Sequence, residues 1–181
     1  MSDQVTVQDT ASSADRAQAV LNVELMMDHY RVGGELRSPG VPRRLVDILN
    51  SADLPFIVVH DAALDDPLID DDEPRRFNLV QVHLDTLLFG IPRAGTQVQP
   101  DPFEIIEKNP VRTTIAMRGF QIVGNVYFTQ GLDPTSSQLL GSKYFVPVTD
   151  ACVTSAVRPD CVWQEQVVVV NMARALLFAP H

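Results

Sequence analysis

The stretch Tyr30-Arg31-Val32-Gly33-Gly34-Glu35-Leu36 recurs 90 residues later as Phe120-Gln121-Ile122-Val123-Gly124-Asn125-Val126. Two other segments also recur, in the same order: Phe56-Ile57-Val58-Val59-His60-Asp61-Ala62 as Phe145-Val146-Pro147-Val148-Thr149-Asp150-Ala151, and Leu87-Leu88-Phe89-Gly90 as Leu176-Leu177-Phe178-Ala179. Their offset is 89 residues. Because chance rarely produces three ordered matches at a nearly constant offset, the sequence predicts a tandem duplication.

Each half carries the same pattern of predicted strands. Apolar residues alternate through 21–36 and 113–128, which indicates strands with one buried face. Each run is broken near its middle, at Asp28-His29 and at Arg118-Gly119, by residues that accept a left-handed conformation and favour a hairpin turn. A strand ending in Asp-Ala follows in each half, and then a final strand over 77–91 or 162–178.

Glycines and helix signals refine this plan. Gly34 and Gly124 lie inside the second strand of each half, which indicates a bulge or a sharp bend. Proline, capping and exit residues predict short helices over 42–50 and 133–141. Another predicted helix begins at Asp101 in the link between the halves, and its apolar residues are expected to cap one end of a barrel.

The pattern from Val23-Glu24-Leu25 to Gly34-Glu35-Leu36, and from Ile115-Ala116-Met117 to Gly124-Asn125-Val126, resembles the Sm-like fold. That fold is a small, strongly bent, five-stranded barrel that a short helix often precedes, and any SH3-like barrel could produce a similar pattern. The resemblance implies that RNA-binding members carry an Asn near the third strand and an Arg-Gly pair near the end. Here Phe56 and Phe145 stand at the Asn position and the closing strands lack Arg-Gly, so RNA binding is not carried over.

Composition excludes several classes of function. The 181 residues are 45% hydrophobic and carry a net charge of −9, which suits a chain with a buried core and disfavours a general polyanion binder. The acidic charge lies in the first half, because residues 1–90 hold 16 acids and 7 basic residues, whereas residues 91–181 hold 7 of each. No apolar run reaches the ~18 residues of a membrane span, and the first residues do not read as a secretory signal. Cys152 and Cys161 show no metal or disulfide spacing, so we expect a cytoplasmic protein.

Candidate chemistry is sparse. The acidic stretch 65–73 could gather a hard cation such as Ca²⁺ or Mg²⁺, but a solvated loop between two strands is the preferred interpretation. Its candidate ligands are Asp65, Asp66, Asp70, Asp71, Asp72 and Glu73. No histidine, serine or cysteine stands in a nucleophile or ligand motif, so no catalytic residue and no cofactor is expected. Asp61 and Asp150 are the carboxylates shared at equivalent positions, and a turn role is the simpler interpretation for them.

The sequence therefore predicts a mainly β protein of two tandem small β-barrel-like repeats, Sm-like or SH3-like, with short helices. The expected parts are a flexible tail with a possible short helix over 1–18, a first repeat over 19–93, a linker with a short helix over 94–111 and a second repeat over 112–181. The structural residues expected to shape the repeats are Gly34, Gly124, Asp61, Asp150, Phe56 and Phe145.

Small barrels bury little surface, so the halves should pack together or pair with other chains. The expected function is a non-catalytic protein-interaction or assembly module, with a protein partner or a homo-oligomer. The alternatives are an Sm-like nucleic-acid binder and a metal- or ligand-binding domain that uses the acidic loop.

Overall fold

The computed structural model describes residues 18–40, 43–69, 73–93, 108–129 and 144–181. This part of the chain is mainly β, with ten strands in a single antiparallel sheet and one short α-helix. The elements are β1 (Gln18–Met26), β2 (Arg31–Pro39), α1 (Leu45–Asn50), β3 (Phe56–Asp65), β4 (Arg75–His83), β5 (Phe89–Pro92), β6 (Lys108–Met117), β7 (Phe120–Thr129), β8 (Phe145–Ser155), β9 (Val162–Asn171), the 3-10 turn η2 (Met172–Arg174) and β10 (Ala175–Pro180).

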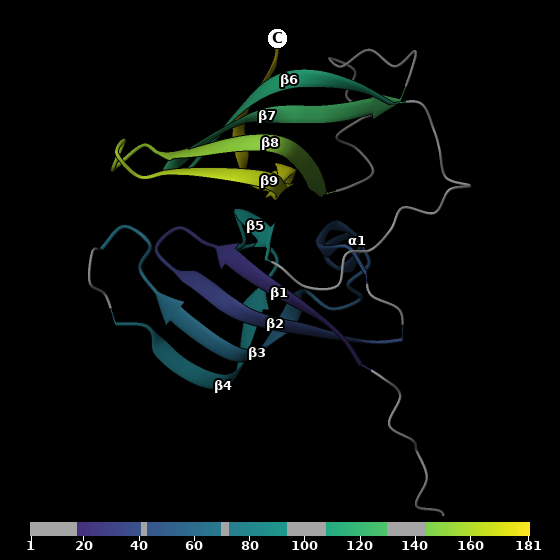
Figure 1. Ribbon diagram of the computed structural model, residues 1–181, viewed down its shortest axis with the longest axis vertical. Coiled ribbons are helices and arrows are strands. Elements are labelled where there is room, and N and C mark those ends of the chain that lie inside the picture. The colour runs from purple at the N-terminus through teal and green to yellow at the C-terminus, as the bar shows by residue number, and fades with distance from the viewer. Residues whose placement is uncertain (1–17, 41–42, 70–72, 94–107, 130–143) are drawn as a thin grey trace, which may run out of the picture.

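The strand order contains the same five-stranded unit twice. The sheet runs β10-β6-β7-β8-β9-β5-β1-β2-β3-β4, so the order β5-β1-β2-β3-β4 is repeated as β10-β6-β7-β8-β9. We call these units the first repeat and the second repeat; Figure 1 shows them as two sets of strands with β5 between them. The ends of the sheet, β4 and β10, are not hydrogen-bonded to each other, so a mainly β fold is confirmed but closed barrels are not.

Matching backbone hydrogen bonds fix which residues of the repeats are equivalent. The Leu84 amide donates to the Pro55 carbonyl at 2.9 Å, and the Met172 amide donates to the Tyr144 carbonyl at 2.7 Å. At the end of each repeat, the Arg93 amide donates to Asn22 and the His181 amide to Arg112, each at 2.8 Å. The offset is therefore 90 residues through the first two strands, 89 in the third and 88 in the last two.

This register corrects the third sequence match. Leu25 pairs with Gly90, and its equivalent Ile115 pairs with Phe178. Phe89 therefore corresponds to Leu177 and not to Phe178, one residue away from the alignment of the two Leu-Leu-Phe motifs. A shift of one residue turns a side chain to the other face of the sheet, so the correction decides which side chains are equivalent.

The final strand expected in each half is two strands. A turn separates β4 from β5, and η2 separates β9 from β10, so the last strand of each repeat crosses to the far side of its unit. In the second repeat the Asn171 side chain stabilises this turn, because its Oδ1 accepts the Ala173 amide at 3.1 Å. The apolar pattern runs on through this break and therefore does not show it.

The expected bend at Gly34 and Gly124 is present in both repeats. The pairing of β2 with β3 shifts between Gly33 and Glu35, and that of β7 with β8 shifts between Val123 and Asn125. A Cβ on Gly34 would lie 2.7 Å from the His60 carbonyl oxygen, and one on Gly124 would lie 2.8 Å from that of Thr149. Only glycine allows so close an approach of the neighbouring strand.

Other local expectations are met in part. Gly119 has a φ of 75°, as its turn requires, whereas Asp28 and His29 form their turn without a positive φ. In that turn the Met27 amide donates to the Tyr30 carbonyl at 2.9 Å, and the pairing of β1 with β2 begins one residue further out, at Met26 and Arg31. Helix α1 ends at Asn50 as expected. The helices expected in the tail, after Asp101 and over 133–141 fall largely or wholly outside the described residues, and β6 begins at Lys108.

Two hydrophobic cores lie under the repeats, and each is completed by the other repeat. The core of the first repeat includes Phe145 and Val169 from the second. The core of the second repeat includes Met26, Phe89 and Ile91 from the first. The expectation that the halves pack together is therefore confirmed.

Candidate functional site

The two repeats are joined edge to edge by β5 and β9, and we call this contact the inner joint. Phe89 pairs with Val170 and Gly90 with Val169, in antiparallel register. The Asn171 amide extends the ladder by donating to the Leu88 carbonyl at 2.9 Å. Because β5 also pairs with β1, it has a hydrogen-bonded strand on each side.

Two asparagine side chains reinforce the inner joint. The Asn171 amide group donates to the Leu84 carbonyl at 3.0 Å and to the Leu87 carbonyl at 2.9 Å. From the other side, Asn50 at the end of α1 donates to the Phe145 carbonyl at 2.8 Å and accepts the Phe145 amide at 3.0 Å. The Asn171 side chain thus provides hydrogen-bond partners for the Leu84 and Leu87 carbonyls, and the Asn50 side chain does so for both main-chain groups of Phe145.

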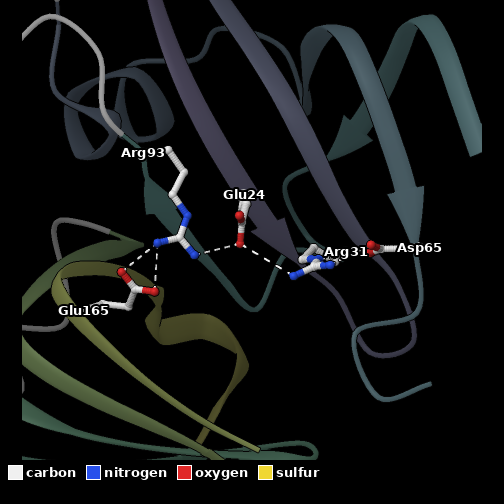
Figure 2. Close-up of polar contacts among 5 residues, drawn as sticks. All are labelled: Glu24, Arg31, Asp65, Arg93 and Glu165. Atoms are coloured by element: carbon white, nitrogen blue, oxygen red, sulfur yellow. Dashed lines mark hydrogen bonds and ion pairs between the residues drawn. The ribbon is translucent and has the colours of Figure 1, made fainter. Parts of the chain in front are cut away.

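A chain of charges crosses the inner joint, as Figure 2 shows. Arg93, just after β5, donates through Nη1 to both carboxylate oxygens of Glu165 at 2.8 Å and through Nη2 to Glu24 at 2.9 Å. Glu24 lies 3.9 Å from Arg31, which holds Asp65 with two hydrogen bonds of 3.0 and 2.6 Å. These five charges alternate in sign, so each carboxylate of the chain faces a guanidinium.

Arginine stays charged throughout this network. The hydrogen bond to Glu24 and, less strongly, that to Glu165 raise the pKa of Arg93, while burial opposes them. The hydrogen bond to Asp65 likewise raises the pKa of Arg31. Because the pKa of each arginine is raised, both guanidiniums keep their charge at neutral and mildly alkaline pH, and their pairing with ionised carboxylates persists there.

A second polar contact joins the hairpin turns of the two repeats. Asp28, between β1 and β2, has its Oδ2 3.5 Å from Arg118 Nη1 and 3.5 Å from Arg174 Nη2. Asp28 and Arg118 occupy equivalent positions in the two repeats. The other oxygen of Asp28, Oδ1, is buried and has no hydrogen-bond partner among the residues that the structure describes.

The charged network of Figure 2 is not repeated at the end of the second repeat. His181 stands at the position of Arg93 and Thr114 at that of Glu24, and they are joined by a 2.8 Å hydrogen bond between Nε2 and Oγ1. On β4, Phe77 stands at the position of Glu165. The polar bridge therefore belongs to the inner joint alone, and the outer ends of the sheet have a more apolar composition.

Within the described part of the chain, strands β4 and β10 form the outer edges of the sheet, and each has one neighbouring strand there. Leu79 on β4 is 50% exposed, and Leu176 and Leu177 on β10 are 76% and 50% exposed. Neither strand has a charged residue over 77–82 or 175–180. Long apolar edges invite pairing with another chain, and proteins usually guard them with charges or bulges. Strand β10 has such an irregularity at its start, where its register against β6 shifts between Ala175 and Leu177.

The sequence-predicted candidates divide by role. Asp61 and Asp150 are not brought together; each lies on the bulged strand of its own repeat with a φ of 48°. Phe145 is buried in the first core, and the ring of Phe56 lies 6.0 Å from that of His83. Gly34 and Gly124 allow the close strand approach described above.

The acidic loop is described only in part. The Asp65 carboxylate is held by Arg31, and Asp66 accepts the Leu68 amide at 2.9 Å. Among the described residues no three His, Cys, Asp or Glu side chains gather in a way that could hold a metal ion. Asp70, Asp71 and Asp72 lie outside these residues, and a cation site in the loop stays a prediction.

Sequence reasoning missed the residues of the inner joint. Asn171 gave a signal, since it is a lone amide after four valines, a polar residue in a buried run. Arg93 gave a weaker one, because Pro92-Arg93 and Pro180-His181 end the two repeats in the same way. The partners Glu24 and Glu165 could not be found, because they meet through the strand order and not through spacing.

Comparisons with protein-family models, with curated proteins and with solved structures found no match to this chain. Within the described part of the chain, no helix is long and apolar enough to cross a membrane.

Proposed function

We propose that this chain is a non-catalytic assembly module, a structural subunit whose outer edges bind other protein chains by strand addition. The observation that carries the proposal is the pair of apolar edge strands, β4 and β10, at the ends of a sheet whose repeats are themselves joined edge to edge. Main-chain hydrogen bonds would supply affinity, and the exposed leucines would supply apolar contact.

Two small barrel-like units of the Sm-like or SH3-like kind are part of this proposal. Each repeat has five antiparallel strands, a glycine bend and its own core. A cytoplasmic location is proposed as well, because the free thiols of Cys152 and Cys161 suit a reducing compartment.

Light scattering of the purified chain over a wide concentration range tests the proposal. We expect masses above the 20.0 kDa of one chain, and we expect Leu79→Lys and Leu177→Lys to shift the mass towards that value. Val157→Lys is the matched control, because Val157 is 70% exposed but lies in the turn between β8 and β9, which are inner strands of the sheet. A mass of 20.0 kDa at every concentration would contradict an assembly function.

The nucleic-acid alternative needs a separate measurement. Filter binding of a short RNA at low salt should show no tight retention, because the chain has a net charge of −9. Tight binding that weakens steeply with salt would favour the Sm-like nucleic-acid function instead.

A further inference from the structure

We infer that the strand partner of β4 is β10 of a second copy of this chain, paired in the register of the inner joint. This inference rests on the proposed assembly function and adds the partner and the geometry. We call the contact the outer joint; it would place Val82 of one copy opposite Leu177 of the next, and Gln81 opposite Phe178.

The first argument is the equivalence of the strands. The inner joint pairs the fourth strand of one repeat, β9, with the fifth strand of the other, β5. The remaining fourth and fifth strands are β4 and β10, and they are the two ends of the sheet. Transferring the pairs Phe89–Val170 and Gly90–Val169 to their equivalents gives the register stated above.

The main-chain groups that would form the hydrogen bonds of the outer joint follow from those of the inner joint. At the inner joint the Asn171 amide donates to the Leu88 carbonyl. The equivalent groups are the His83 amide of one copy and the Leu176 carbonyl of the other. The pair next to this hydrogen-bonded position, Val82 and Leu177, would be a non-hydrogen-bonded pair with its Cα atoms about 4.5 Å apart.

The second argument is the pattern of exposure. Four of the large apolar residues on the surface have equivalents at the inner joint that are covered. Leu176, Leu177 and Tyr30 are 76%, 50% and 48% exposed, while Leu88 and Phe89 are 0% and Phe120 is 2% exposed. Leu79 is 50% exposed, while its equivalent Val167 packs against the first core.

The packing of the inner joint shows what would cover them. Phe89 of the first repeat packs edge-on against Phe120 of the second, with 5.3 Å between ring centroids. The outer joint would bring Leu177 of one copy to Tyr30 of the next in the same relation. Each copy would thus bury the exposed apolar residues of its neighbour, which is the complementarity that a specific interface needs.

The third argument is charge at the hairpin turns. The inner joint sets Asp28 against Arg118, and these residues are equivalent. At the outer joint Arg118 of one copy would stand where Asp28 stands, and Asp28 of the next copy where Arg118 stands, so opposite charges meet again. The Asp28 carboxylate, whose Oδ1 has no hydrogen-bond partner among the described residues, would then face a third guanidinium in addition to those of Arg118 and Arg174.

The two edges differ, so the association is head to tail. Each added copy buries one β4 and one β10 and presents another of each at the ends. Such heterologous contacts produce a ring when the rotation closes and a filament when it does not. Two copies related by a twofold axis, with β4 against β4, would be a different assembly.

Disulfide trapping tests the register. In a background without Cys152 and Cys161, Val82→Cys and Leu177→Cys are made in separate full-length chains, mixed and oxidised. We expect covalent dimers in the mixture and none in either chain alone, because a disulfide requires close Cα atoms and Cβ atoms that point together. Phe178→Cys is the matched control; in the regular part of β10 it is the next residue after Leu177, faces the other side of the sheet and should not cross-link to Val82→Cys.

The outcomes separate the register of the outer joint from the proposed assembly function. Cross-linking of Val82→Cys with itself would show twofold pairing and overturn the inference. Masses above that of one chain without the cross-link in the mixture would overturn the register while the assembly function stands. Should either cysteine variant fail to fold, the pair Gln81→Cys and Phe178→Cys tests the same register from the other face. A purely monomeric protein would overturn both the inference and the proposed function.

Discussion

Asp61 and Asp150, 89 residues apart, have the same left-handed backbone with a φ of 48°. They are the non-glycine residues with positive φ in the described chain, and each lies on the bulged strand opposite a required glycine. Asp61 is held by Arg37 at 2.5 Å and Asp150 by the Asn125 amide at 3.0 Å. The same backbone conformation in the two repeats is thus supported by two different side-chain partners.

The loss of stability on replacing these aspartates should depend on the backbone conformation that the new residue allows, and not on its charge. We expect Asp150→Val to lower the free energy of unfolding by about 1–2 kcal/mol, because a β-branched residue disfavours the left-handed region. Asp150→Gly should cost less than about 0.5 kcal/mol, because glycine adopts this conformation readily. Urea unfolding at equilibrium measures both; equal losses would show that the side-chain hydrogen bond is the dominant contribution.

The paired glycines predict a second contrast. Gly124→Val should destabilise the protein by at least about 2 kcal/mol, because its Cβ would collide with the backbone of β8. Gly33→Val should cost far less, since the nearest atom to a Cβ there is Glu24 Cγ at 3.9 Å and the equivalent residue is already Val123. Thermal unfolding of both variants measures the difference, and similar melting temperatures would contradict the close approach.

The buried amide of the inner joint predicts a third effect. Asn171→Ala removes the donor to the Leu84 and Leu87 carbonyls and should cost about 2–4 kcal/mol, because buried acceptors are left without partners. Asn78→Ala on the exposed part of β4 is the control and should change stability by less than about 0.5 kcal/mol. A small loss at Asn171, read from the shift in the urea midpoint, would mean that water replaces the amide.

The charge bridge predicts a fourth. Arg93→Met leaves the Glu165 carboxylate, which is 14% exposed, without its guanidinium and should cost about 1–3 kcal/mol. Arg75→Met, on an exposed residue, is the matched control. Because the pKa of Arg93 is raised, the guanidinium stays charged at neutral and mildly alkaline pH, where the carboxylates are ionised as well. The difference between Arg93→Met and the parent should therefore stay constant between about pH 6 and 10; a difference that vanishes as the pH rises towards 10 would contradict the bridge.

The sequence predicted what depends on local repetition and chain pattern. The duplication, the strands, the turn at Gly119 and the bend at Gly34 and Gly124 follow from alternation and from glycine, whose backbone freedom is a local property. The break between β4 and β5 was missed because apolar residues continue across it. The one-residue shift at Phe89 was missed because side-chain similarity aligns Leu-Leu-Phe with Leu-Leu-Phe, whereas hydrogen bonding decides the register.

The site escaped prediction for another reason. Arg93 and Glu165 are 72 residues apart and meet because β9 lies beside β5, which no local pattern encodes. Asp28 was considered only as a turn residue, and its contact with Arg118 depends on the packing of two turns. Residues that join repeats are determined by topology, and a single sequence shows them only as polar residues in apolar runs.

The inner joint has a kinetic consequence, because both of its strands belong to one polypeptide. Strand β5 meets β9 at an effective concentration that is set by the connecting chain and does not change when the protein is diluted. Any contact that β4 or β10 makes with another chain has no such advantage and must form at the concentration of free protein in the cell. The duplication therefore turns one bimolecular encounter into a first-order folding step, and it fixes the two kinds of repeat in a strict one-to-one ratio.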